Sequence, residues 1–316
     1  MGSPKPRHLP LAHEDEVIQR IRGMVGNGNE AFGLRDDAAV LDVPGGGPLV
    51  VSVDSVVEGV HVDLSVCSPG DVGWKALMGA LSDLAAMGAA PLGALVALCV
   101  PGGSGEGELA LGVMAGVGEA AAASGCPVVG GDVSEAGELV VAVTVLGTVE
   151  AGGGGPVSRA GAQPGDVVLV TGPCGGSAAG LRELRAGDSG GEAYRRPVAL
   201  LAEGEAARVI GAHAMIDVSD GLALDLHRLA DASGVGFRLE DVPVAEGATL
   251  EEALGGGEDY ELVITAGASA ADGMRASFAA DGLREPVRIG VIVDEPTTRT
   301  LHGQDLGRLG WQHRLG

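Results

Sequence analysis

A change of hydrophobic period at residues 214–230 most constrains the fold of this chain. The run Ala214–Val218 is short and apolar, as is typical of a buried strand. From there the apolar residues recur at helical spacing, at Leu222, Leu226, Leu229 and Ala230. A strand that passes directly into a helix is a building unit of α/β proteins. We therefore expect an α/β or mixed α+β fold.

Three polar residues stand at this change of period. Ser219 or Asp220 could serve as the N-cap of the helix, which is the simplest role for either. Asp217 is different, because a cap does not require an acid at the end of a buried strand. Strand ends next to helix N-termini are where α/β proteins bind metals and phosphates. The stretch therefore indicates either a helix cap or a ligand site.

The length of the chain and one glycine-rich segment predict two domains. The chain has 316 residues and is 46% hydrophobic, which suffices for two cores. Aromatic residues make up only 2%, so these cores must consist of Val, Leu and Ala. Residues 151–156 contain four consecutive glycines and resemble a linker. We therefore expect an N-terminal domain over 1–150 and a C-terminal domain over 151–316.

Charge and composition exclude several function classes. The formal net charge of −23 argues against a nucleic-acid or anionic-membrane surface. The two lysines, Lys5 and Lys75, follow Pro4 and Trp74, so no Walker A loop is present. The four cysteines are widely spaced, which predicts small buried side chains and no zinc site. No apolar run reaches the ~20 residues of a membrane span, and we expect a soluble cytoplasmic protein.

Acids recur where the sequence predicts that strands and helices end. Asp54 and Asp132 each follow an apolar run, Asp37 precedes one, and Asp83 lies beside small residues on a helix over 71–87. Converging carboxylates cost several kcal/mol each in repulsion and desolvation unless cations neutralise them. Oxygen ligands alone favour magnesium, which bridges phosphate oxygens. We therefore expect magnesium and a polyphosphate, with Arg159 as a direct guanidinium contact.

Six motifs in chain order together resemble the thiamine-monophosphate kinases, in the superfamily of aminoimidazole ribonucleotide synthetase. They are Asp36-Asp37-Ala38-Ala39-Val40, Ser52-Val53-Asp54 with His61, Leu81-Ser82-Asp83-Leu84-Ala85-Ala86-Met87-Gly88-Ala89, Gly130-Gly131-Asp132, Asp217-Val218-Ser219-Asp220-Gly221-Leu222 and Gly257-Glu258-Asp259-Tyr260-Glu261-Leu262. The resemblance implies the two-domain fold of that superfamily and a homodimer whose N-terminal sheets pair. It also implies an active site between the domains and ATP-dependent phosphorylation of thiamine monophosphate to thiamine diphosphate.

The resemblance also assigns roles to residues. The implied magnesium ligands are Asp37, Ser52, Asp54, Asp83, Asp132, Asp217 and Asp220. The implied ATP contacts are Gly131, Arg159 and Ser219, and the implied thiamine-phosphate pocket comprises His61, Glu258 and Trp311. Among the acids, Asp54, Asp83 and Asp220 are the strongest candidates for catalysis. No covalent nucleophile is needed, because the acceptor is already an ionised phosphate oxygen.

The sequence departs from the family pattern at two places. Arg35 stands where the family usually has glycine, and residues 101–111 lack the aromatic that the family often places against adenine. Two alternatives stay open. One is another ATP-dependent enzyme of the superfamily, such as an aminoimidazole ribonucleotide synthetase, and the other is a non-catalytic protein that binds divalent cations. The polar segment 182–192 is expected to be mobile.

Overall fold

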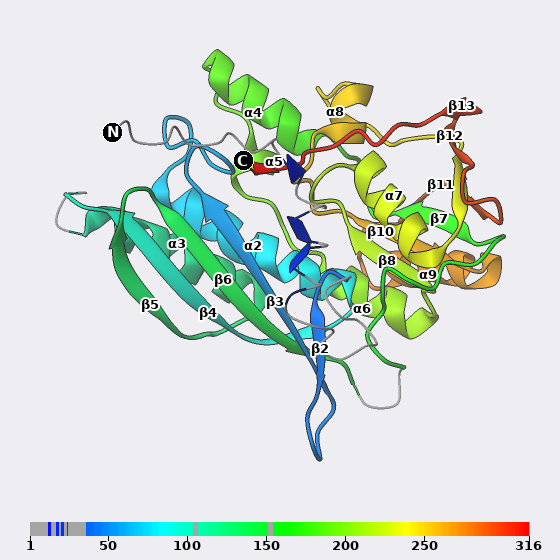
Figure 1. Cartoon of the computed structure of the whole chain (residues 1–316), viewed down its shortest axis with the longest axis horizontal. Helices are drawn as coiled ribbons and strands as arrows, with labels where there is room; N and C mark the ends of the chain where they lie inside the picture. Colours follow the sequence, from blue (N-terminus) through cyan, green and yellow to red (C-terminus); the bar gives the residue numbers. More distant parts are fainter. Residues whose placement is uncertain are drawn as a thin grey trace, which may run out of the picture.

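The computed structural model describes residues 36–103, 107–150 and 154–315, together with residues 12–13, 17–18, 20–21 and 24. The helix expected near residues 14–25 lies mostly outside the described residues, and Arg35 lies wholly outside them. Within the described part, the elements form two large sheets with helices packed on them, and a further pair of two-residue strands (Figure 1). The mixed α/β fold class expected from the sequence is confirmed.

The N-terminal half consists of a five-stranded sheet with two helices on one face (Figure 1). The sheet order is β2-β3-β6-β4-β5, and only the β4–β5 pair is parallel. Its elements are β2 (Ala39–Asp42), β3 (Pro48–Val57), α2 (Pro69–Ala86), β4 (Ala90–Pro101), α3 (Glu108–Ser124), β5 (Val128–Ala136) and β6 (Val140–Thr148). Valine, leucine and alanine dominate the buried core, as the scarcity of aromatics requires.

The C-terminal half consists of a seven-stranded, mostly antiparallel sheet between helices. The sheet order is β13-β12-β9-β11-β7-β10-β8. Its strands are β7 (Val167–Val170), β8 (Ala214–Asp217), β9 (Gly236–Leu239), β10 (Leu262–Ala266), β11 (Val287–Val293), β12 (Arg299–Leu301) and β13 (Gln304–Asp305). The helices are α4 (Gly176–Ala186), α5 (Glu192–Arg195), α6 (Leu201–Ile210), α7 (Leu222–Ser233), α8 (Leu250–Gly255) and α9 (Ala268–Ala280). Separate apolar clusters on its two faces hold α7 on one side and α6 and α9 on the other.

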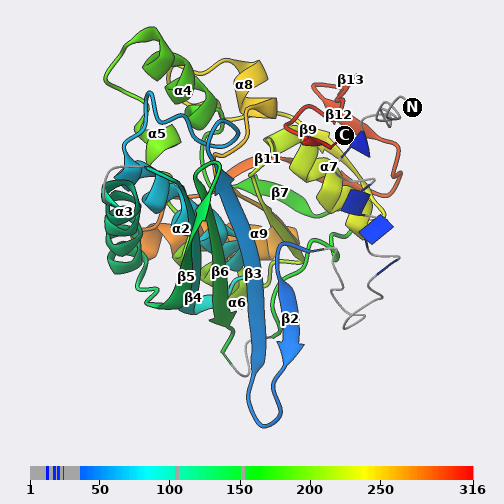
Figure 2. The ribbon, with the colours of Figure 1, turned by 60° about the vertical axis from the view of Figure 1, so that its left-hand side comes forward.

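Helix α2 lies between the two sheets and joins the halves (Figure 2). Ser68 caps its N-terminus in a capping box with Asp71, and Pro69 occupies its first turn. Its C-terminal turn approaches α6 so closely that a Cβ on Gly204 would lie 2.0 Å from the carbonyl oxygen of Ala85. Gly204 of α6 therefore permits the close contact between the two halves.

Several local expectations were wrong. Asp54 and Asp132 lie inside β3 and β5, because the residues after each continue to pair with neighbouring strands. The side chains of Ser219 and Asp220 do not cap α7, whose N-cap is Gly221; the Asp225 carboxylate instead accepts from the Asp220 and Gly221 amides. The expected mobility of segment 182–192 stays a prediction; parts of the segment belong to α4 and α5. The described termini also pair, β1 (Ala12–His13) with β14 (Arg314–Leu315).

The contact between α2 and α3 depends on glycine. A Cβ on Gly73 would lie 1.9 Å from the carbonyl oxygen of Val113, so alanine requires the two helices to separate. We expect Gly73→Ala to lower the free energy of unfolding by about 1–3 kcal/mol, measured by urea denaturation. Gly118→Ala is the matched control on the exposed side of α3, where nothing lies within 4 Å of an added Cβ. This control should gain about 0.5–1 kcal/mol from helix propensity, and equal losses in both variants would contradict the packing argument.

Candidate active site

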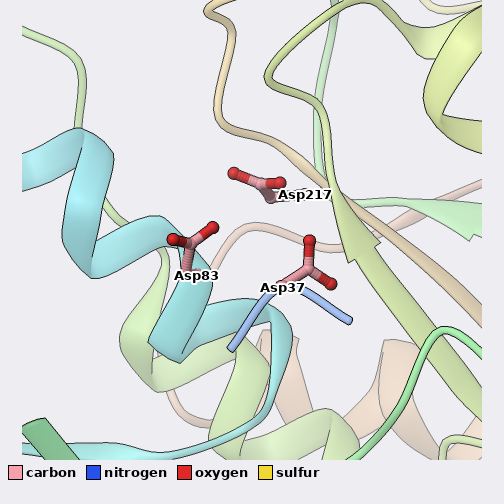
Figure 3. A group of neighbouring side chains, drawn as sticks. All are labelled: Asp37, Asp83 and Asp217. Carbon is pink, nitrogen blue, oxygen red and sulfur yellow. The ribbon is translucent and has the colours of Figure 1, made fainter. Parts of the chain in front are cut away.

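Three carboxylates meet where the two halves adjoin. Asp37 precedes β2, Asp83 lies in the last turns of α2 and Asp217 ends β8. Figure 3 shows their carboxylates turned toward one another, and one oxygen of each lies within 4.8 Å of the others. We call Asp37, Asp83 and Asp217 the acid cluster. Residues 46 to 180 positions apart thus form one site, as the recurrence of acids in the sequence predicted.

Burial and mutual repulsion make the ionised form of the acid cluster energetically unfavourable. Burial raises the pKa of Asp83 well above its usual value, and the charges of Asp217 and Asp37 raise it further. Burial also raises the pKa of Asp217, to which Asp37 adds. Oδ2 of Asp37 is buried and has no hydrogen-bond partner among the described residues. Three converging carboxylates and an unpartnered buried oxygen are the donor set that a divalent cation requires.

Hydroxyl groups and one guanidinium hold the acid cluster in place. Ser52 on β3 donates to Oδ2 of Asp83, and Ser82 donates to Oδ2 of Asp217 at 2.6 Å. Arg159 forms an ion pair with Oδ1 of Asp37 at 2.5 Å. The Arg159 side chain is only 23% exposed, so it brings one positive charge to the buried acids. Ser52 and Arg159 therefore lie at the predicted site.

Asp36 fixes the segment that carries Arg159. Its carboxylate accepts from the Ser158 hydroxyl and, at 2.9 Å, from the Arg159 amide. Burial is the largest cause of the raised pKa of Asp36, partly offset by the hydrogen bond from Ser158. Asp36 thus acts as a structural anchor between the halves, while Asp37 belongs to the acid cluster. The two members of the acidic pair have different tasks.

A cavity of about 320 Å³ opens beside the acid cluster. Asp83 and Asp217 line it together with the rings of His61, Trp311 and His313. Along α2, Asp83 lies about two turns beyond Lys75, whose ammonium contacts the His61 carbonyl, so the acid cluster and the His61 segment lie at different levels of this helix. Most of the predicted site residues line it. Its lining includes Val53, Asp54, Val60, His61, Gly79, Asp83, Leu181, Asp217, Ser219, Asp220, Gly256, Glu258, Tyr260, Trp311 and His313.

Two predicted site residues lie elsewhere. Gly131 and Asp132 are exposed on β5, the edge strand, and are absent from the cavity lining. Asp132 pairs with Ala97, on the outer face of the sheet, whereas Asp54 belongs to the face toward α2. A Cβ on Gly131 would lie 1.9 Å from the carbonyl oxygen of Val96, so glycine is required there by strand packing.

The loop that carries Glu258 has an unusual backbone. Glu258 and Tyr260 have φ angles of 57° and 52°, in the left-handed region. Such a conformation costs on the order of 1–3 kcal/mol for a residue with a side chain, and it persists where the surroundings hold it. Hydrogen bonds from the Glu258 amide to Ser219 and from the Tyr260 amide to Val218 hold it here. Both side chains are thereby directed into the cavity.

Sequence reasoning missed Lys75, Tyr260 and His313. Lys75 is 1% exposed and pairs with Oε1 of Glu258 at 2.8 Å. The signal for it was its rarity: one of two lysines in the chain, with apolar residues on both sides of it in the helix. The His313 ring lies 5.3 Å from that of His61 and 6.1 Å from that of Trp311. The three rings therefore form one wall of the cavity.

Known families match both halves of the chain. The family model "AIR synthase related protein, N-terminal domain" matches residues 35–149, and "AIR synthase related protein, C-terminal domain" matches residues 163–302. The chain therefore has the two-domain architecture of the AIR synthase related proteins.

Individual relatives show which of the AIR synthase related proteins this chain is similar to. Thiamine-monophosphate kinase of Bacillus subtilis is 35% identical over 306 residues, covering 89% of this chain and 93% of the relative. That of Mycobacterium tuberculosis H37Rv is 34% identical over 318 residues, covering 95% and 91%. A solved structure of AaThiL complexed with AMPPCP and TMP is 28% identical, with a TM-score of 0.83 and coverage of 98% and 99%. The chain belongs to the thiamine-monophosphate kinase family.

The acid cluster predicts a defined response to magnesium. In EDTA we expect Asp83→Asn to melt at or above the wild-type temperature, because the substitution removes a buried charge that faces two others. Millimolar MgCl2 should raise the melting temperature of wild type but not of the variant, as measured by differential scanning fluorimetry. Asp272→Asn, an exposed acid on α9, is the control and should respond like wild type. A full magnesium response in Asp83→Asn would remove this residue from the site.

Proposed function

We propose that the protein transfers the γ-phosphate of ATP to thiamine monophosphate, giving thiamine diphosphate. The observation that carries this proposal is one cavity lined both by acids and by the rings of His61, Trp311 and His313. Such a cavity suits a substrate with a phosphate at one end and cationic rings at the other. The described helices include none that could span a membrane. Because ATP is the co-substrate, we place the reaction in the cytoplasm.

We infer that Asp37, Asp83 and Asp217 hold magnesium together with the substrate phosphates. Bound there, magnesium would neutralise the acids and the oxygens of the polyphosphate. Asp54 and Asp220 line the same cavity and are the further ligands we assign. Ser52 positions Asp83 through its hydroxyl. The roles of Asp54, Asp83 and Asp220 in catalysis are thus to orient the two phosphates for in-line attack.

The nucleotide contacts follow from the residues around the acids. Arg159 is the nearest guanidinium to the acid cluster, and its pairing with Asp37 fixes its direction. Ser219 lies on the cavity wall between Asp217 and Asp220. We assign both to the ATP phosphates, because a guanidinium and a hydroxyl supply donors that the carboxylates lack.

The opposite end of the cavity suits the thiamine rings. The Trp311 side chain is about half exposed and lies next to His313, which in turn lies next to His61. A positively charged ring stacked on tryptophan gains about 0.5–2 kcal/mol. Burial lowers the pKa of His61, which keeps the ring neutral and avoids repulsion of a cationic substrate. Glu258 adds a carboxylate for the ring substituents.

The chemistry requires little beyond positioning. The acceptor oxygen of thiamine monophosphate is already ionised, so no residue has to remove a proton from an alcohol. Free thiamine lacks the phosphate that the acids and their cations hold. We therefore expect the enzyme to discriminate by the acceptor phosphate.

A chromatographic assay tests this directly. With ATP and magnesium, thiamine monophosphate should be converted to thiamine diphosphate, whereas free thiamine should give no thiamine monophosphate. The control Asp272→Asn should retain wild-type turnover, and Asp83→Asn should lose about two orders of magnitude or more. Efficient phosphorylation of thiamine would refute the assigned acceptor. Magnesium-dependent stabilisation without any response to nucleotide would favour a non-catalytic cation-binding protein.

We further propose a homodimer formed by the outer face of the five-stranded sheet. Helices α2 and α3 cover the other face, and the outer face exposes Val53 and Leu95 by 65% and 41%. These residues flank Thr144 in one cross-strand row, so both apolar side chains lie on the same face of the sheet, one on each side of Thr144. A second copy on this face would cover them and bring its own Gly131 and Asp132 toward the first chain.

Light scattering tests the dimer. Wild type should give about twice the chain mass of 31.2 kDa, and Leu95→Glu should give the monomer, because it places a charge in the apolar row. The matched control is Leu111→Glu, at an exposed leucine of α3 on the other side of the sheet. A wild-type monomer at micromolar concentration would contradict the proposed interface.

A further inference from the structure

Lys75 is a charged side chain that is only 1% exposed, and its polar contacts are with Glu258 and His61, two residues that line the cavity. Its ammonium pairs with Oε1 of Glu258 at 2.8 Å and donates to the carbonyl oxygen of His61 at 3.1 Å. It also lies 3.8 Å from the centroid of the Tyr194 ring. The Tyr194 hydroxyl donates to the same His61 carbonyl at 3.1 Å. One buried cation thus joins α2, α5, the segment after β3 and the loop before β10.

A buried ammonium of this kind is costly unless its surroundings compensate for it. Removing a charge from water is unfavourable, so a buried position that served only stability would hold an apolar residue. Burial lowers the pKa of Lys75, and the Glu258 carboxylate opposes this effect. Breaking such a pair from one side leaves the other charge buried and unpaired. The pair is unequal, because the Lys75 side chain is 1% exposed and that of Glu258 is 26% exposed. The ammonium depends on the pair for its burial, while the carboxylate gains a fixed position from it.

Glu258 needs this constraint because its own backbone is strained. Its φ angle of 57° directs the side chain into the cavity, where about a quarter of it remains exposed. A carboxylate on a long side chain can adopt many rotamers, each of which would present it differently to a ligand. With Oε1 held by Lys75, the carboxylate has one position. The His61 carbonyl, held by the same ammonium, fixes the neighbouring part of the ring pocket.

We propose that Lys75 is a positioning residue for thiamine monophosphate: its ammonium preorganises Glu258 and the His61 segment for the substrate rings, without touching the phosphates. This inference rests on the proposed function and identifies what sets affinity for the acceptor. A preorganised pocket loses less conformational freedom when the ligand binds. Loss of the ammonium should therefore weaken binding of the acceptor and leave ATP binding and phosphate transfer nearly unchanged.

The test uses Lys75→Met, which keeps the length of the side chain, Glu258→Gln, and the double variant in the full-length protein. Lys75→Met should raise both KM and the calorimetric Kd for thiamine monophosphate about tenfold or more. Its kcat and its KM for ATP should stay within about twofold of wild type. In the Glu258→Gln background the same substitution should change KM by less than about twofold, because the two residues act as one unit.

A core variant on the same helix separates positioning from stability. Leu77→Ala removes a fully buried side chain and should lower the midpoint of urea denaturation, yet it should leave KM for thiamine monophosphate unchanged. If Lys75→Met fails to fold, the double variant, which removes both charges, becomes the test and should match Glu258→Gln in Kd. Any of three results would overturn the inference. They are additive effects of the two substitutions, an unchanged KM in Lys75→Met, and failure of both Lys75→Met and the double variant to fold.

The calorimetric Kd also distinguishes this inference from the proposed function. If wild type binds thiamine monophosphate but produces no thiamine diphosphate, the proposed reaction fails while Lys75 is still judged by Kd. If wild type neither binds nor converts it, both fail. If wild type does both and Lys75→Met is indistinguishable from it, only the role of Lys75 fails.

Discussion

Electrostatic repulsion within the acid cluster is the constraint on which the rest of the structure depends. Asp37, Asp83 and Asp217 come from three distant segments, and burial and mutual repulsion raise the pKa of Asp83 and Asp217. The fold holds them together with hydroxyl donors, with Arg159 and with the close packing of α2 on both sheets. Because a bound cation would offset this repulsion, the acid cluster suits magnesium and the phosphates that magnesium binds.

Two different electrostatic arrangements therefore suit the acid end and the ring end of the cavity to their ligands. At the acid end, unneutralised negative charge creates affinity for cations and, through them, for phosphates. At the ring end, charge is already neutralised within the protein, because Lys75 pairs with Glu258. The acid end is stabilised when its ligands bind, whereas the arrangement of the ring end is already formed before a ligand binds. This division suits a substrate whose phosphate reacts and whose rings serve only for recognition.

The position of α2 links these arrangements. Lys75, Gly79, Ser82 and Asp83 recur along one stripe of this helix and face, in turn, Glu258, Tyr260, Asp217 and the acid cluster. The opposite stripe packs against α3 and the five-stranded sheet. A displacement of α2 would thus alter both ends of the cavity together. The glycine contacts of α2 with α3 and α6 make that displacement difficult.

The sequence by itself determined the mixed α/β class, the order of most elements and the acids worth considering, because these follow from local periodicity and from residue chemistry. The sequence could not define where β3 and β5 end. These strands continue past Asp54 and Asp132 because the residues that follow pair with neighbouring strands. It also could not distinguish the exposed Asp132 from the buried Asp217, because burial depends on which face another segment covers. Only the tertiary structure decided that Lys75 belongs to the cavity, since its partners Glu258 and Tyr194 lie more than a hundred residues away in the chain.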